Sequence, residues 1–372
     1  MAPSVRIISA VQTLQVEVGH SSYPITIGSG LLSNRELLEQ QIPGRDLLIV
    51  TNTTIAKLYL AKLAGSFTQR RIADCILPDG EQHKTLQTAG WVFDALVANK
   101  LNRDATVLAL GGGVVGDIAG FVAACYQRGI GFVQIPTTLL AQVDSSVGGK
   151  TGVNLAVGKN LIGSFHHPRL VMADTAVLRT LPPAELRAGL FESLKAGLIY
   201  DSDLFGFIEQ NTDALLRQET APLTHVIAES VRIKADVVSQ DEREAGLRMI
   251  LNFGHTVGHA IESLTHYRGL LHGEAVGWGM RVAVEASRGR GLPKIEANRI
   301  LAAIDALGLP PLPRLTARRL LNAAAGDKKR IGSVRHFVLL DRIGQAKVVK
   351  DLGDDELFPC IQDGLQLKRQ DR

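Results

Sequence analysis

Three of the four histidines in the segment LNFGHTVGHAIESLTHYRGLLHGE, residues 251–274, are spaced so that they could bind one cation. His255 and His259 are four residues apart in a run with helical apolar spacing, so both can project from one face of a helix. His272 follows after a connection long enough to fold back. Imidazole suits zinc, and a catalytic zinc usually has three protein ligands and one open position. The segment therefore indicates a metal centre whose oxygen ligand must come from elsewhere in the chain. Two histidines on a helix are, however, also common as structural or exposed residues.

Glu192 and Lys195 are three residues apart in a second predicted helix. Such a pair is commonly an exposed ion pair that contributes only a few tenths of a kcal/mol. Alternatively, Glu192 supplies the oxygen ligand that His255 and His272 lack, which would complete a site of two histidines and one glutamate. The residues alone leave both interpretations open.

A glycine-rich turn, GGGVVGD at residues 111–117, follows an apolar run and precedes the helical run IAGFVAACY. Gly111, Gly113 and Gly116 match GxGxxG in the context of a strand followed by a helix, where bare backbone can approach a pyrophosphate. The acidic ribose partner usual about 20 residues further on is missing, because residues 129–138 contain no Asp or Glu. The turn is thus either a dinucleotide site or a tight turn without a ligand.

Three further segments carry polar groups. PDGEQHKT at 78–85 is either a helix cap or a turn with a carboxylate for ribose hydroxyls and a lysine for phosphate. The segment PTT at 136–138 ends a predicted strand, and QVDSSVGGKTGVN at 142–154 is expected to be a polar, glycine-rich loop. Within that loop Lys150 resembles an anion ligand, and GKN at 158–160 repeats the same chemistry.

The elements that must position these residues change type along the chain. Residues 11–28 alternate apolar and polar as in a hairpin, and short apolar strands are expected at 47–50, 106–110, 131–135 and 170–173, with an amphipathic helix at 84–101. This predicts a mostly parallel, Rossmann-like sheet whose ligand crevice lies at the carboxyl ends of the strands. From Pro182-Pro183 onward the pattern is helical, except for a late hairpin, HFVLLDRIGQAKVVKD. We expect an α/β N-terminal domain, 1–181, and a mainly α-helical C-terminal domain, 182–372.

The composition narrows the class of protein. The chain has 372 residues, of which 45% are hydrophobic and 21% charged, as in an ordinary soluble enzyme. Its three cysteines are widely separated, its start lacks the pattern of a signal peptide, and no apolar run approaches the length of a membrane span, so we expect a cytoplasmic protein without a membrane partner. The net charge of +4 comes from scattered residues and aromatics are only 5%, which favours a small anionic substrate over nucleic acid.

Taken together, seven segments resemble the 3-dehydroquinate synthase family of sugar-phosphate cyclases, in that family's order. They are DGEQHKTL, GGGVVGDIAGFVAACYQRGI, IPTTLLAQVDSSVGGKTGVN, TLPPAEL, ESLKAGLI, LRMILNFGHTVGHAIE and LHGEAVGWGM. The resemblance covers about residues 15 to 345. It implies an N-terminal NAD-binding domain, a C-terminal metal- and substrate-binding domain, a homodimer, and a zinc ion, or a cobalt ion in its place, held by Glu192, His255 and His272.

The resemblance also implies roles for further residues. NAD is expected to contact Asp79, Gly80, Glu81, Gln82, His83, Lys84, Gly113, Val114, Val115, Gly116, Asp117, Thr137, Thr138, Asp144, Lys150, Lys159, Val177, Leu178, Arg179 and Thr180. The substrate carboxylate is expected to meet Lys234 and Arg248. Its phosphate is expected to meet Lys150, Asn160, Asn252 and either Lys328 or Lys329, with Arg128 from the other subunit. The catalytic group implied is Lys195, His259, Asp144 and Asn160, with Lys195 and His259 near the reacting hydroxyls.

One position departs from the family pattern. After the strand LLIV the family commonly has an Asp, and two residues later an Asn, that touch the adenosine; here these are Asn52 and Thr54. Asn52 can form hydrogen bonds but offers no carboxylate for both ribose hydroxyls, so we expect NAD binding to persist with some loss of affinity.

The reaction implied by the resemblance converts 3-deoxy-arabino-heptulosonate 7-phosphate to 3-dehydroquinate and phosphate, with NAD recycled. The alternatives are another sugar-phosphate cyclase, whose substrate has no carboxylate, and a metal-dependent NAD alcohol dehydrogenase of related architecture. Arg248 and the segment GGKTGVN favour the keto acid, because an arginine suits a carboxylate and a lysine suits a phosphate.

Overall fold

The computed structural model describes residues 11–18, 21–241, 246–331 and 336–366, and the chain forms two compact units. The first contains residues 1–181 and 220–239, and the second contains 182–219 and 240–372. The change of unit at Leu181 and Pro182 falls where the paired prolines are. Residues 220–239, which the expected boundaries place in the C-terminal domain, group instead with the sheet. They belong to helix α8 (Thr220–Gln240), and helical periodicity does not say which unit a helix packs against.

The described part of the first unit is built around a seven-stranded sheet of order β1-β2-β9-β6-β5-β3-β4. Its strands are β1 (Gln12–Val18), β2 (Ser21–Gly28), β3 (Asp46–Asn52), β4 (Arg71–Leu77), β5 (Thr106–Gly111), β6 (Gly131–Pro136) and β9 (Leu170–Asp174). β1 and β2 form the antiparallel hairpin expected at residues 11–28, and all other neighbours pair in parallel. The predicted mostly parallel sheet is therefore confirmed.

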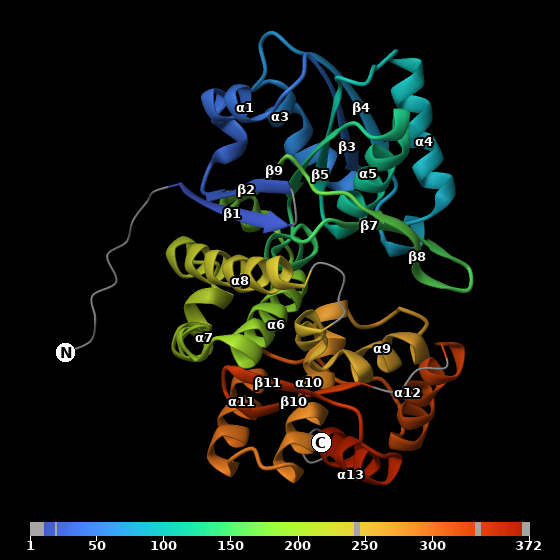
Figure 1. Cartoon of the computed structure of the whole chain (residues 1–372). Helices are drawn as coiled ribbons and strands as arrows, with labels where there is room; N and C mark the ends of the chain where they lie inside the picture. Colours follow the sequence, from blue (N-terminus) through green and yellow to red (C-terminus); the bar gives the residue numbers. More distant parts are fainter. Residues whose placement is uncertain (1–10, 19–20, 242–245, 332–335, 367–372) are drawn as a thin grey trace, which may run out of the picture. The chain divides into compact units, whose positions relative to one another are not determined.

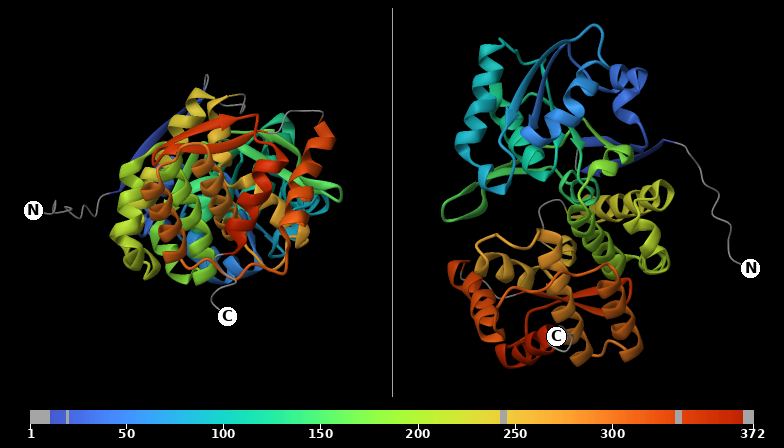
Figure 2. Two further views of the ribbon diagram at one scale, coloured as in Figure 1. Left: turned by 90° about the horizontal axis from the view of Figure 1, so that it is seen from below. Right: turned by 180° about the vertical axis from the view of Figure 1, so that it is seen from behind.

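Helices cover both faces of this sheet. α4 (Leu86–Ala98) and α5 (Gly113–Cys125) lie on one face, and α1 (Arg35–Gln41) and α3 (Ala61–Ala64) lie on the other (Figures 1 and 2). Leu48 and Val50 of β3 join Val92 of α4 and Ile118 of α5 in one buried cluster. Because side chains alternate along a strand, the intervening residues Leu47 and Ile49 point to the opposite face, where they too are buried. Burial on both faces explains why these strands read as continuous apolar runs.

The segment expected as a loop at residues 142–154 contains a strand. β7 (Lys150–Leu155) pairs antiparallel with β8 (Gly158–Phe165), and residues 142–145 belong to a π-helical segment (Ala141–Ser145), so the loop prediction holds only for residues 146–149. The glycines had suggested a loop, but Gly152 and Gly163 face each other across the hairpin and allow its strands to pair closely. A Cβ built on Gly163 would lie only 2.1 Å from the carbonyl oxygen of Thr151. Lys150 therefore stands at the start of a strand.

The second unit is mainly helical. Its elements are α6 (Pro183–Tyr200), α7 (Ser202–Leu216), α9 (His255–Leu264), α10 (His272–Gly289), α11 (Lys294–Ala306), α12 (Ala317–Ile331), the hairpin β10 (Phe337–Arg342) and β11 (Gln345–Val349), and α13 (Asp354–Gln366). α6 begins with a proline in its first turn, where the missing N–H costs nothing. α10 packs against α6, α9, α11 and α13. Among the described residues no helix combines the length and apolarity needed to cross a membrane.

Candidate metal centre and cofactor-binding residues

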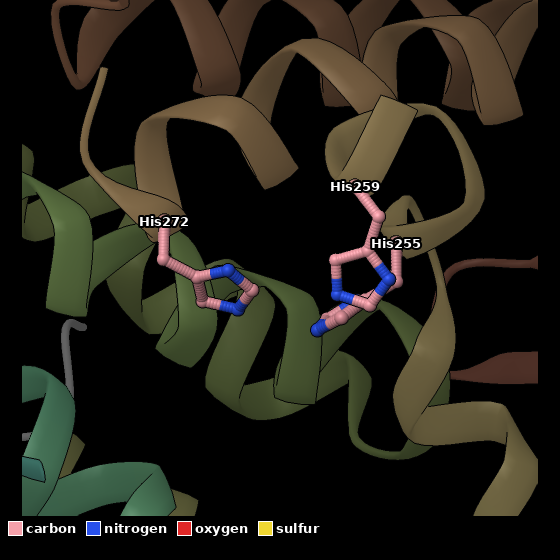
Figure 3. A group of neighbouring side chains, drawn as sticks. All are labelled: His255, His259 and His272. Carbon is pink, nitrogen blue, oxygen red and sulfur yellow. The ribbon is translucent and has the colours of Figure 1, made fainter. Parts of the chain in front are cut away.

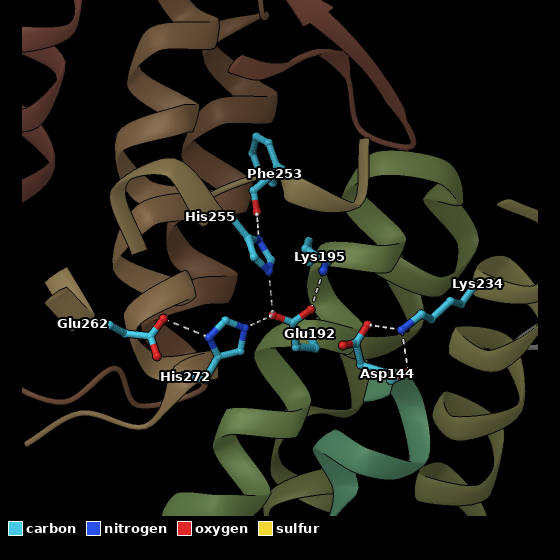
Figure 4. Close-up of polar contacts among 8 residues, drawn as sticks. All are labelled: Asp144, Glu192, Lys195, Lys234, Phe253, His255, Glu262 and His272. Atoms are coloured by element: carbon cyan, nitrogen blue, oxygen red, sulfur yellow. Dashed lines mark hydrogen bonds and ion pairs between the residues drawn. The ribbon is translucent and has the colours of Figure 1, made fainter. Parts of the chain in front are cut away.

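Three helices of the second unit bring Glu192 to His255 and His272. Glu192 lies on α6 and is 3% exposed, and the two histidines are the first residues of α9 and α10. The Nε2 atoms of His255 and His272 each lie 3.9 Å from Oε1 of Glu192 (Figure 4). Lys195, one helical turn along α6, forms an ion pair with Oε2 of Glu192. Residues far apart in the sequence thus converge on one carboxylate.

The protonation of His255 suits a ligand. Its Nδ1 lies 3.2 Å from the carbonyl oxygen of Phe253, which can only accept a hydrogen bond, so Nδ1 carries the proton and Nε2 presents a lone pair. Burial, and then the positive charge of Lys195, hold the pKa of His255 well below its usual range. A neutral imidazole with its Nε2 lone pair directed at a carboxylate is prepared for a cation.

The arrangement fits a divalent metal ion. Both carboxylate oxygens of Glu192 are buried, and within the described ranges Oε2 has the ion pair with Lys195, whereas Oε1 has no hydrogen-bond partner. A separation of 3.9 Å is too long for a hydrogen bond between Glu192 and an imidazole. It is close to the roughly 3.3 Å between ligand atoms that surround a tetrahedral ion at about 2 Å. A buried carboxylate oxygen without a partner, as Oε1 is, is costly unless a cation completes it.

His259 belongs to the same cluster and creates a second set of ligands. One ligand atom each from His255, His259 and His272 lie within 4.8 Å of one another (Figure 3). His259 is exposed, whereas Glu192 is fully enclosed. The geometry therefore allows three imidazoles, or two imidazoles and Glu192 with His259 beside the ion.

Glycines place the three helices close enough to form this centre. Gly254 precedes α9 with φ +79°, a left-handed conformation that favours glycine. Gly273 follows His272 and lies directly against the backbone of α6, because a Cβ there would be 2.0 Å from the carbonyl oxygen of Ala188. Ala188 is one turn before Glu192, so this contact sets how closely His272 approaches the carboxylate.

In the first unit, the glycine-rich turn has the expected context. β5 ends at Gly111, Gly112 caps α5, and α5 begins at Gly113. A Cβ on Gly111 would meet Val115 at 2.6 Å, and one on Gly116 would meet the side chain of Gln134 at 2.7 Å. These glycines hold α5 close to the sheet, with the first turn of the helix at the carboxyl edge of the parallel strands. Helix N-termini at this edge bind phosphate groups.

Several predicted cofactor residues meet beside this turn. Lys84 forms an ion pair with Asp117, and its Nζ donates a 2.6 Å hydrogen bond to Asn160. Burial raises the pKa of Asp117, and the positive charge of Lys84 opposes that rise. Lys159 Nζ lies 3.7 Å from Glu81 Oε1. The segment DGEQHK and the β7–β8 hairpin are thus assembled into one polar group.

Asn52 and Thr54, which differ from the family pattern, both contact Asp79, a residue predicted to bind NAD. Asn52 Nδ2 donates to Asp79 Oδ1 at 2.8 Å, and Thr54 Oγ1 donates to Asp79 Oδ2 at 2.6 Å. Asn52 ends β3, and its parallel partner Leu77 ends β4 two residues before Asp79. Asp79 thus presents, at this edge, a carboxylate that Asn52 cannot offer.

The cations predicted to bind the substrate, Lys234, Arg248 and Arg128, lie in different environments. Lys234 of α8 donates to Asp144 Oδ1 at 2.7 Å. Arg248 is buried, and its backbone N–H donates to Asp241 at 3.0 Å. Arg128 is exposed and has a left-handed backbone with φ +66°. Thr137 and Thr138 directly follow β6, and Val177, Leu178, Arg179 and Thr180 belong to the short helix Thr175–Thr180. The side chains of Lys328 and Lys329 lie outside the described residues.

Two neighbours of the metal centre were not anticipated from the sequence. Glu262 lies 3.1 Å from Nδ1 of His272, and the carbonyl group of Phe253 fixes His255. The position of Glu262, three residues after His259 in the predicted helix, was a signal for the first. A backbone carbonyl leaves no signal in the residue types.

Solved structures of sugar-phosphate cyclases share this fold. A 2-epi-5-epi-valiolone synthase from Streptomyces hygroscopicus, solved with NAD+ and Zn2+, has a TM-score of 0.86 at 31% identity and covers 94% of this chain and 99% of its own. A 2-deoxy-scyllo-inosose synthase complexed with carbaglucose-6-phosphate, NAD+ and Co2+ has a TM-score of 0.84 at 28% identity, covering 95% and 100%. The fold and the centre thus define an enzyme of the sugar-phosphate cyclase class.

Family models and a relative narrow this class. The model for the 3-dehydroquinate synthase N-terminal domain matches residues 74–188, and that for the C-terminal domain matches residues 189–330. A 3-dehydroquinate synthase of Nitrosococcus oceani is 50% identical over 354 residues, covering 94% of this chain and 98% of the relative. The chain belongs to the 3-dehydroquinate synthase family.

Proposed function

We propose that this chain converts 3-deoxy-arabino-heptulosonate 7-phosphate to 3-dehydroquinate and phosphate, as a phosphate-eliminating carbon–oxygen lyase with bound NAD and a divalent metal. The observation that carries the proposal is the buried carboxylate of Glu192, which lies 3.9 Å from the Nε2 atoms of both His255 and His272. Relatives that are about half identical over nearly the whole chain support this particular substrate.

In this proposal Glu192, His255 and His272 hold zinc or cobalt. His259 stays beside the metal and hydrogen-bonds a reacting hydroxyl, as its exposed side chain allows. Lys195 neutralises part of the charge of Glu192 and orients it through their ion pair. The metal ion, when bound, supplies a Lewis acid for the hydroxyls of the substrate.

NAD in this proposal is held by the first unit. The pyrophosphate would meet the backbone from Gly113 to Asp117, and the ribose and phosphates would meet the segment from Asp79 to Lys84. Thr137, Thr138, Lys159 and the residues 177–180 would complete the contacts. NAD, when bound, supplies a hydride acceptor that later returns the hydride.

The anionic ends of the substrate account for the remaining cations. Arg248 and Lys234 would hold the carboxylate, while Lys150, Asn160, Asn252 and one of Lys328 and Lys329 would hold the phosphate. Arg128 would reach the substrate of the partner subunit of a homodimer. Its exposed side chain and left-handed backbone support this role, because strained backbone persists where a side chain must be aimed.

The residues mainly bind and orient the substrate. Once C5 is a ketone, the adjacent C–H bond would be more acidic, so phosphate would leave as that proton is lost, with the phosphate itself as the base. His259 and Lys195 would polarise the reacting oxygens. Asp144 is held by Lys234 at 2.7 Å and would help to fix the substrate and NAD. Reduction of the C5 ketone back to the alcohol, ring opening and an aldol closure would then give the product. The free cysteines fit a cytoplasmic location.

Product analysis with the heptulosonate phosphate tests this function. We expect phosphate and 3-dehydroquinate to form in equal amounts, without a net change in absorbance at the nicotinamide band. We also expect a chelator to stop the reaction. A metal-dependent alcohol dehydrogenase would accumulate NADH instead. Turnover of a sugar phosphate without a carboxylate, in preference to the keto acid, would indicate another cyclase and would remove the role given to Arg248.

A further inference from the structure

A second buried carboxylate, that of Glu262 on α9, lies behind the candidate metal centre. Glu262 is 5% exposed, and its Oε2 lies 3.1 Å from Nδ1 of His272 (Figure 4). The other ring nitrogen, Nε2, faces Oε1 of Glu192 at 3.9 Å. An ionised carboxylate only accepts hydrogen bonds, so Nδ1 of His272 carries the proton and Nε2 offers its lone pair to the centre.

The two imidazoles of the centre are therefore supported differently. Nδ1 of His255 donates to the neutral carbonyl group of Phe253, whereas Nδ1 of His272 donates to a charged group. A charge-assisted hydrogen bond is roughly twice as strong as a neutral one, and it makes the ligand nitrogen more basic. The side chain of His272 is also the more exposed of the two, at 31% against 13%, so it depends more on an outer contact to hold its orientation.

We propose that Glu262 is a positioning residue that fixes the tautomer and ring orientation of His272 and strengthens its bond to the metal. The inference rests on the proposed metal centre of Glu192, His255 and His272. The formal charges of the buried side chains support this role. Two carboxylates, Glu192 and Glu262, and one ammonium group, Lys195, sum to one negative charge, which complements a divalent cation.

Metal binding by the chelator-stripped full chain tests this role, with Glu262→Gln and Glu262→Ala compared with the wild type. Competition with a chromophoric chelator gives the Kd for Zn2+, and the visible spectrum of the Co2+ form reports ligand geometry. We expect Glu262→Gln, which keeps an acceptor but no charge, to raise the Kd about 10-fold, and Glu262→Ala to raise it about 100-fold with a changed Co2+ spectrum. Glu274→Gln is the matched control, because Gln can keep the 2.9 Å bond of that buried side chain to the backbone N–H of Leu271; its Kd should stay within about threefold of the wild type.

The outcomes separate this inference from the proposed function. A wild-type protein that binds neither Zn2+ nor Co2+ would overturn both. Wild-type binding together with unchanged Kd values and spectra in both Glu262 variants would overturn the positioning role alone. If Glu262→Ala fails to fold, the nearly isosteric Glu262→Gln decides, and a wild-type Kd in that variant would refute the role of the charge.

Discussion

Replacing Gly273 by alanine tests how the start of α10 positions His272. A Cβ at Gly273 would lie 2.0 Å from the carbonyl oxygen of Ala188, and 2.6 and 2.7 Å from its carbonyl carbon and Cα. Real Cβ atoms essentially never come within 3.0 Å of such neighbours, so the first turn of α10 must move away from α6 by at least about 1 Å. Metal–ligand distances tolerate only about 0.2 Å.

The expected loss of metal affinity in Gly273→Ala follows from the steric overlap that metal binding would restore. In the metal-free protein the start of α10 can move and relieve the overlap. Binding of the metal by Glu192 and His272 would draw α10 back against Ala188. Overpacking of this kind costs about 1–3 kcal/mol, which corresponds to a metal Kd between about 5-fold and about 150-fold weaker.

The assay is Zn2+ competition with a chromophoric chelator, together with thermal unfolding of the metal-free protein. Gly289→Ala is the matched control, because Gly289 ends the same helix and a Cβ there would meet no heavy atom within 4 Å. We expect its metal Kd to equal that of the wild type. Wild-type affinity in Gly273→Ala would refute the reasoning that this glycine contact sets the distance between His272 and Glu192.

Three further predictions concern other residues. Glu192→Ala should lose the metal, whereas His259→Ala should keep one metal per chain and lose turnover; metal analysis showing the reverse would exchange their roles. Burial raises the pKa of Cys75 to about 11, so at pH 8 only about one Cys75 side chain in a thousand is a thiolate and its alkylation should be slow. The alkylation rate should increase about tenfold per pH unit up to about pH 11, and a rate at pH 8 equal to that of an unstructured thiol would contradict this. Asp174→Ala should lower the free energy of unfolding in urea by about 3 kcal/mol or more, because its buried carboxylate accepts three backbone N–H groups at 2.8, 2.9 and 2.9 Å; a loss below about 1 kcal/mol would contradict that.

Local patterns made much of the fold predictable. The alternation at residues 11–28 gave the β1–β2 hairpin, and short apolar runs gave the parallel strands β3, β5, β6 and β9. The spacing of His255 and His259 placed both on one helix, as observed in α9. Each of these signals lies within one element, where periodicity of the side chains directly reports which face is buried.

What the sequence did not reveal depends on contacts between distant segments. α8 has an ordinary amphipathic pattern, which does not reveal that most of it packs with the sheet unit. The contact of Glu262 with His272 joins two helices, and the glycines of β7 and β8 serve strand pairing rather than a loop. Side-chain chemistry was readable from residue types, whereas the partners of each side chain required the fold.

X-ray absorption spectroscopy of the zinc-loaded protein tests the metal centre most directly, because it counts imidazole ligands. We predict two imidazoles and oxygen donors at about 2.0–2.2 Å, with the same spectrum in His259→Ala. Three imidazoles in the wild type, falling to two in His259→Ala, would contradict this assignment, because they would show that His259 is a ligand alongside His255 and His272.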